Sequence, residues 1–139
     1  MSTHIDHVPR WVRMAVAILA LLNILYGLRC YFDTHVLFHA ATGIDLDNPL
    51  IRNAGYEFAA RNLAIGVALG FVTIIRGAPE ALTILTLVRA LIEVQTIILS
   101  LVRGDISAML LVPVLLLAVE IYIVKTLVGV IKLEEELEK

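Results

Sequence analysis

Long apolar runs, broken by few polar positions, dominate the chain. An α-helix rises about 1.5 Å per residue, so about 20 mostly apolar residues cross the roughly 30 Å of bilayer hydrocarbon. Four runs reach this length, at approximately residues 11–30, 55–76, 79–102 and 106–131. The pattern therefore predicts an all-α integral membrane protein, with a single four-transmembrane-helix domain over residues 1–139.

The connections between these runs predict how the helices are arranged. Short turns at 76–79 and 103–105 join the second, third and fourth helices, and short turns place consecutive helices side by side in opposite directions. The 31–54 connection is longer, and its Asp-Asn-Pro segment has turn chemistry. We expect an antiparallel four-helix bundle with this long outer loop as a cap over one end.

Composition agrees with a membrane protein and excludes other classes. Of the 139 residues 60% are hydrophobic, whereas soluble domains are apolar at roughly half of their positions. The net charge is −2 and the basic residues are not clustered, so nucleic acid is not an expected partner. The single Cys30 offers neither a redox pair nor a thiolate cage, and no cofactor is predicted.

The basic residues near the helix ends predict the orientation in the membrane. Arg10, Arg13, Arg76, Lys132 and Lys139 fall on one side, and Arg29, Arg52 and Arg103 fall on the other. Because basic residues are enriched on the cytoplasmic side, we expect both termini in the cytoplasm and the 31–54 loop outside a plasma or inner membrane.

Four charged residues lie well inside the apolar runs: Arg61, Arg89, Glu93 and Glu120. Each costs about 2.5–3.5 kcal/mol at the bilayer centre on insertion scales, so each is expected to face the bundle interior and to have a partner. Measured along the helices from the 103–105 turn, Arg89 and Glu120 lie at similar depth, and Glu93 lies one turn farther out, toward Arg61. The predicted network is Arg61–Glu93–Arg89–Glu120.

Further polar residues surround this network. Asn23 and Tyr26 share a face of the first helix, and Glu57 precedes Arg61 by one turn. Together with Asn62, they are the candidate substrate-binding residues of a polar pocket that opens outward beneath the loop. Asn62 also shares a face with Gly66 and Gly70, and such small residues favour close packing of membrane helices.

The outer loop offers a weak candidate metal site. His35 and His39 are spaced so that both can face one metal on a helical turn, and Asp33 lies nearby. No further ligand follows at a fixed spacing, so no metal site is predicted. The aromatic residues of this segment favour an amphipathic stretch at headgroup depth instead.

The second helix also carries a family resemblance. The segment Gly55–Gly66, the Arg-Gly turn at 76–77 and a third helix with Arg89 and Glu93 resemble the DoxX-like superfamily of small four-helix membrane proteins, in particular its uncharacterised branch. The likeness covers helices 2 and 3, and helices 1 and 4 only by length and order. It implies the four-helix fold. Some relatives serve quinone- and thiol-linked redox systems, but this chain lacks the cysteines for a thiol role.

These observations favour the hypothesis that the charged pocket binds a small lipophilic substrate and performs acid–base chemistry on it, as an epoxide hydrolase, isomerase or cyclase does. Glu93 would act as the base, held in place by Arg61 and Arg89, and Glu120 would act as the proton donor. A low-dielectric site can separate the pKa values of two carboxyl groups, so that one accepts a proton and the other donates one. Asn23 and Tyr26 would position a substrate oxygen.

The sequence is also compatible with two other functional hypotheses. The charged network is purely structural if the protein is a non-catalytic accessory subunit of a membrane redox or assembly complex. The third hypothesis is a proton-coupled transporter, since series of Arg and Glu residues within the membrane also occur in transporters. Four spans are few for a pore, so transport would require a homodimer built on a face such as that of Asn62, Gly66 and Gly70. The expected partners are thus a lipophilic molecule, membrane lipids, and a second copy or a larger membrane complex.

Overall fold

The computed structural model describes residues 8–33, 47–76, 78–102, 104 and 108–137. Its elements in chain order are α1 (Arg10–Phe32), α3 (Pro49–Phe71), the π-helical turn η2 (Val72–Arg76), α4 (Pro79–Val102), the 3₁₀ turn η3 (Ala108–Leu110) and α5 (Leu111–Leu137). Helices α1, α4 and α5, and α3 extended into η2, are long and apolar enough to cross a membrane. The prediction of an all-α protein with four helices of spanning length is confirmed.

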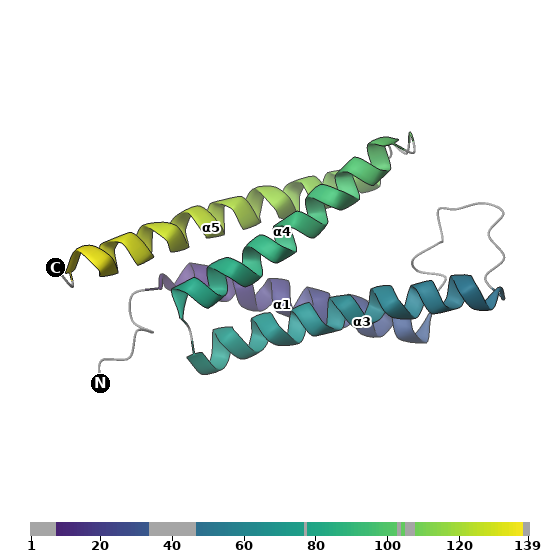
Figure 1. Cartoon of the computed structure of the whole chain (residues 1–139), viewed down its shortest axis with the longest axis horizontal. Helices are drawn as coiled ribbons and strands as arrows, with labels where there is room; N and C mark the ends of the chain where they lie inside the picture. Colours follow the sequence, from purple (N-terminus) through teal and green to yellow (C-terminus); the bar gives the residue numbers. More distant parts are fainter. Residues whose placement is uncertain (1–7, 34–46, 77, 103, 105–107, 138–139) are drawn as a thin grey trace.

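The helices associate in two pairs. Helix α1 packs mainly on α3, and α4 packs mainly on α5, with fewer contacts between the pairs. Figure 1 shows that the two helices of each pair run in opposite directions. The pairs approach each other where η2 leads into α4, and they diverge toward the opposite ends of the helices (Figure 1).

Glycines bring α1 and α3 into close contact. A Cβ atom on Gly66 would lie 2.9 Å from the carbonyl oxygen of Ala20 and 2.9 Å from the backbone nitrogen of Ile24. A Cβ atom on Gly27 would lie 3.0 Å from the carbonyl oxygen of Ala59. The two backbones therefore touch, as small residues allow in membrane helices, and the predicted close packing of the Gly66 face is confirmed.

The apolar core lies at the end where the pairs meet. All four long helices contribute to it, through Val12, Val16, Leu19, Ala20, Leu69, Leu82, Ile123 and Leu127, with Val8 ahead of α1. Nearby, the ring of Trp11 stacks on that of Tyr122 with 5.2 Å between centroids. This stacking joins α1 to α5, so the first and last helices are linked at the same end of the molecule.

Helix α3 begins earlier than the predicted start at residue 55. Asn48 caps it, since its side-chain oxygen accepts a hydrogen bond from the backbone N–H of Leu50 at 3.0 Å, and Pro49 occupies the first turn, where no N–H is needed. The Asn-Pro pair is thus a helix start rather than part of a loop. The predicted 31–54 connection is shorter at both ends, because α1 continues to Phe32.

Helix α5 begins later than the predicted start at residue 106. Proline lacks a backbone N–H and is accommodated in the first turn of a helix, and Pro113 lies in the first turn of α5. The 3₁₀ turn η3 precedes it. At its other end α5 continues to Leu137, beyond the predicted end at residue 131.

Candidate functional site: a buried charged cluster

Arg89, Glu93 and Glu120 form a charged cluster near the middle of α4 and α5. Arg89 and Glu93 are one turn apart on α4 and form a hydrogen-bonded ion pair. The same Nη1 atom of Arg89 lies 3.6 Å from Oε1 of Glu120. All three residues are buried, and Glu120 is 0% exposed. The predicted Glu93–Arg89–Glu120 part of the network is confirmed.

The hydrogen bonding of this cluster is incomplete. Neither carboxylate oxygen of Glu120 has a hydrogen-bond partner among the described residues, and neither does Nε of Arg89. A charged group buried without such partners is costly in a low-dielectric interior. The cluster also contains two carboxylates and one guanidinium, so the single arginine can balance the charge of only one of the two carboxylates.

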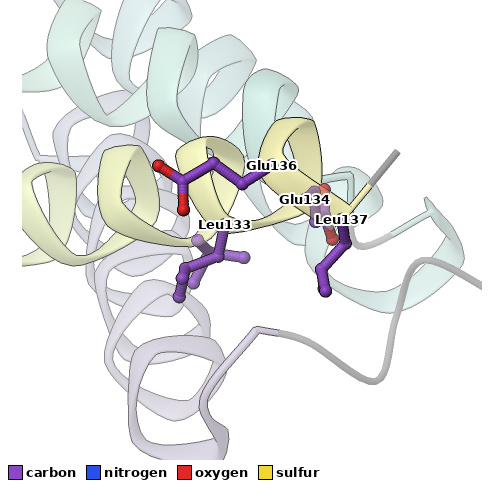
Figure 2. A pocket seen from close by; sticks show the side chains of 5 residues that line it. Leu133, Glu134, Glu136 and Leu137 are labelled. Atoms are coloured by element: carbon purple, nitrogen blue, oxygen red, sulfur yellow. The ribbon is translucent and has the colours of Figure 1, made fainter. Parts of the chain in front are cut away.

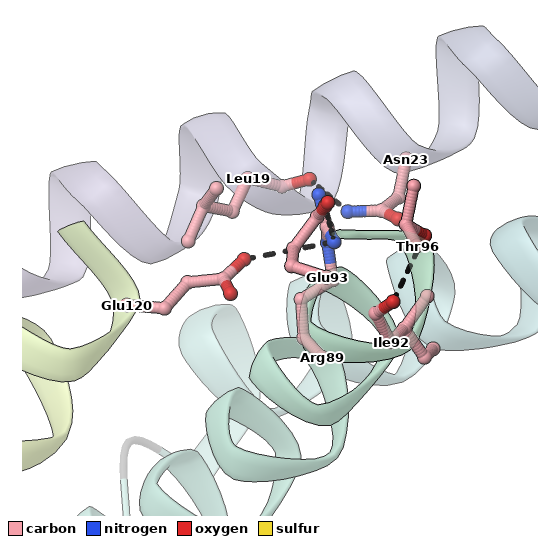
Figure 3. A network of polar contacts seen from close by, with 7 residues as sticks. All are labelled: Leu19, Asn23, Arg89, Ile92, Glu93, Thr96 and Glu120. Carbon is pink, nitrogen blue, oxygen red and sulfur yellow. Dashed lines mark hydrogen bonds and ion pairs between the residues drawn. The ribbon is translucent and has the colours of Figure 1, made fainter. Parts of the chain in front are cut away.

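The polar residues around the cluster are satisfied within their own helices. On α1, the buried Asn23 donates from Nδ2 to the carbonyl oxygen of Leu19 at 2.7 Å. On α4, the buried Thr86 donates to the carbonyl oxygen of Leu82 at 2.7 Å. Figure 3 shows the side chains of the cluster on the side of α4 that faces α1, where Leu19 and Asn23 lie.

The predicted contact between Arg61 and Glu93 is wrong. Arg61 pairs instead with Glu57, one turn away on α3, at 3.6 Å, and the two side chains are 75% and 74% exposed. The cause is the packing of α3, which turns Ala59 and Gly66 toward α1. Because a helix turns about 100° per residue, Glu57 and Arg61 then point to the opposite side, away from the cluster.

Two other candidate residues contact α3 rather than the cluster. The ring of Tyr26 meets that of Phe58 edge-on, with 6.0 Å between centroids. Asn62 donates from Nδ2 to the carbonyl oxygen of Phe58 at 3.0 Å. The expected outward pocket lined jointly by Asn23, Tyr26, Glu57 and the charged network is therefore not formed as predicted, since of the first three only Asn23 is buried, beside α4.

The candidate metal ligands lie largely outside the described residues. His35 and His39 fall in the undescribed range 34–46. Asp33 ends α1, where its backbone N–H donates to the carbonyl oxygen of Arg29 at 2.8 Å. Within the part of the chain that the structure describes, no group of three or more His, Cys, Asp or Glu side chains is placed to hold a metal ion.

A hollow of about 450 Å³ lies at the C-terminal end of α5, away from the charged cluster. Its lining residues are Val130, Leu133, Glu134, Glu136 and Leu137. Figure 2 shows Glu134 and Glu136 on this last part of the helix together with the two leucines. Its walls come from neighbouring turns of one helix, so it is a surface depression rather than a site built between helices.

Comparison with protein families, with characterised proteins and with solved structures gives no match to this chain. The DoxX-like resemblance therefore stays a prediction from the residues of the second and third long helices, α3 and α4. The geometry of the charged cluster is the basis for proposing a function.

Proposed function

We propose that this protein is an integral membrane protein that binds a small lipophilic molecule at the Arg89–Glu93–Glu120 cluster. The observation that carries the proposal is the fully buried carboxylate of Glu120, whose two oxygens have no hydrogen-bond partner among the described residues. Membrane charges are expensive and mark functional sites. A ligand that donates a hydrogen bond to Glu120 would supply what the protein side chains leave missing.

The unpartnered atoms define the chemistry of the ligand. Glu120 offers acceptors, and Nε of Arg89 offers a donor. A matching molecule carries a hydroxyl or amine hydrogen for the carboxylate and an oxygen for the guanidinium. The rest of the ligand has to be apolar, because the cluster lies on helices that consist mostly of leucine, isoleucine and valine. Lipid-soluble alcohols and hydroxylated carbonyl compounds fit both requirements.

Acid–base conversion of this ligand is a second candidate function. Two carboxylates, Glu93 and Glu120, share one guanidinium nitrogen, and such a pair supplies the base and the acid of a hydrolase, isomerase or cyclase. Arg61 has no part in this version, because its side chain is exposed on α3. Alanine at Glu93 would abolish turnover of the bound molecule, and unchanged turnover would limit the function to binding.

We further infer that the four helices form an antiparallel bundle in the bilayer, capped by the connection between α1 and α3, with both termini in the cytoplasm. The directions of the helices in Figure 1 and the distribution of basic residues support this arrangement. In intact cells of a Cys30→Ala variant, an impermeant maleimide should label Asp45→Cys and should not label Ser2→Cys. The reverse labelling would invert the topology.

The binding proposal is tested by native mass spectrometry of the protein purified in nanodiscs, with extraction and identification of whatever remains bound. The wild type is compared with Glu120→Gln, which keeps the shape of the side chain and removes its charge. Glu80→Gln is the matched control, because Glu80 is exposed in the first turn of the same helix pair. We expect a defined small molecule on the wild type and the control, and its loss from Glu120→Gln.

An empty wild type that is folded and helical would refute this proposal. Co-purification with a larger membrane protein would then favour the accessory-subunit function. Proton-coupled flux after reconstitution into liposomes would favour transport.

A further inference from the structure

Helix α3 presents a charged and small-residue face that no described residue of the chain covers. Its outward stripe contains Glu57, Arg61, Ala64 and Ala68, which recur at helical spacing on the side opposite Ala59. The Glu57 and Arg61 side chains are 74% and 75% exposed. Ala64 is also exposed, and Ala68 is partly exposed.

The position of this face is unusual for a surface that meets lipid. Of the four spans, the one that contains α3 is the least apolar and also the least buried within the chain. Arg61 lies near the middle of that span, Pro49–Ile74. By contrast, the charged cluster of Arg89, Glu93 and Glu120 on α4 and α5 is buried. The least apolar span thus has the smallest buried share although α3 packs closely on α1, and its uncovered side points to an external protein partner.

We propose that α3 is a dimerisation helix and that its partner is a second copy of this chain, related by a two-fold axis along the membrane normal. Two copies with the same orientation place their α3 helices parallel and at equal depth. Glu57 of one copy then lies within one turn of Arg61 of the other, about 6 Å along the axis. Each Glu57 can therefore pair with Arg61 of the other copy, one turn away across the two-fold axis, as it pairs with Arg61 of its own helix.

The shape of the face also suits a second helix. Ala60, Ala64 and Ala68 recur every four residues, and such small-residue spacing lets membrane helices approach closely. The glycine face that the sequence offered for a dimer is not available, because Gly66 already contacts α1. The opposite face of α3 serves the dimer instead, so each α3 is held by α1 on one side and by its copy on the other.

Disulfide cross-linking in proteoliposomes tests the interface. In a Cys30→Ala background, Ala64→Cys places a thiol on the proposed face, and Leu21→Cys places one at the middle of α1, where Leu21 is 55% exposed. Under mild oxidation, we expect Ala64→Cys to form a dimer whose yield persists over a tenfold dilution with lipid. The Leu21→Cys control should form only collisional dimers that fall with dilution. Equal decline of both variants would overturn the proposal.

Charge reversal provides a second, independent readout. The single change Arg61→Glu should lower the dimer fraction at least tenfold, and the double change Glu57→Arg with Arg61→Glu should restore it. Ala64→Leu keeps both charges and is compatible with lipid, so it tests the face without a risk to folding, and we expect it to lower the dimer fraction as well. A purified wild type that stays monomeric, or an Ala64→Leu variant that dimerises normally, contradicts the inference. So does cross-linking of Ala64→Cys only to a different protein in native membranes.

Discussion

The contact between α1 and α3 predicts a sharp difference between two glycines one turn apart. A Cβ atom at Gly66 would meet two backbone atoms of α1 at 2.9 Å, whereas a Cβ atom at Gly70 would meet only the Cβ atom of Ala20, at 3.9 Å. Attractive contacts of carbon atoms lie at roughly 3.5–4.0 Å. Gly66→Ala therefore forces the helices apart, and Gly70→Ala makes an ordinary contact.

The magnitude follows from comparing the two variants directly. Each gains the same helix propensity, about 1 kcal/mol for glycine to alanine in water, so this contribution cancels in the difference. What remains is the cost of overpacking at Gly66, about 1–3 kcal/mol for an inserted carbon in a well-packed contact. We expect Gly66→Ala to lower the free energy of unfolding relative to Gly70→Ala by this amount.

The assay is reversible unfolding in mixed detergent micelles, followed by helical circular dichroism. Gly129→Ala is a further control, because a Cβ atom there meets nothing within 4 Å. It should behave like Gly70→Ala. Equal stability of Gly66→Ala and Gly70→Ala would falsify the backbone contact between α1 and α3. It would also contradict the outward direction of the Glu57 and Arg61 face of α3.

Three further predictions concern other contacts. Arg89→Met leaves two buried carboxylates without a counter-charge and should lower the free energy of unfolding by about 3–5 kcal/mol in the same assay. Adding Glu93→Gln and Glu120→Gln should recover part of this loss, and no recovery would contradict the ion-pair geometry. Trp11→Ala removes the stack on Tyr122 and should cost at least about 0.5–1.5 kcal/mol, with Trp11→Phe nearer the wild type. Asn48→Ala removes the N-cap and should cost about 0.5–2 kcal/mol, seen as faster amide exchange at the start of α3 while α4 is unchanged.

The number and class of the helices followed from sequence because bilayer thickness fixes the length of an apolar run. The predicted helix boundaries were less accurate where a short sequence pattern is compatible with two structures. The Asn48-Pro49 pair suits a turn and equally suits a helix start, and only the cap contact with Leu50 distinguishes them.

The charged cluster was predicted in part for a related reason. Arg89 and Glu93 are linked by their spacing on one helix, and matching the depths of α4 and α5 adds Glu120. Depth does not give the rotation of a helix about its own axis. Arg61 was assigned inward from its cost in lipid, but the glycine contact of α3 with α1 determines its direction and turns it outward.

The spacing of Arg89 and Glu93 also bears on how the protein is made. Chains emerge from the ribosome N-terminus first, so α4 reaches the membrane before α5, the helix that carries Glu120. Because its positive and negative side chains are one turn apart on the same helix, α4 carries its own compensating charge at that stage. Glu120 then arrives with α5 and meets an arginine that is already in place. The order of the charges along the chain thus matches the order in which the bilayer has to accept them.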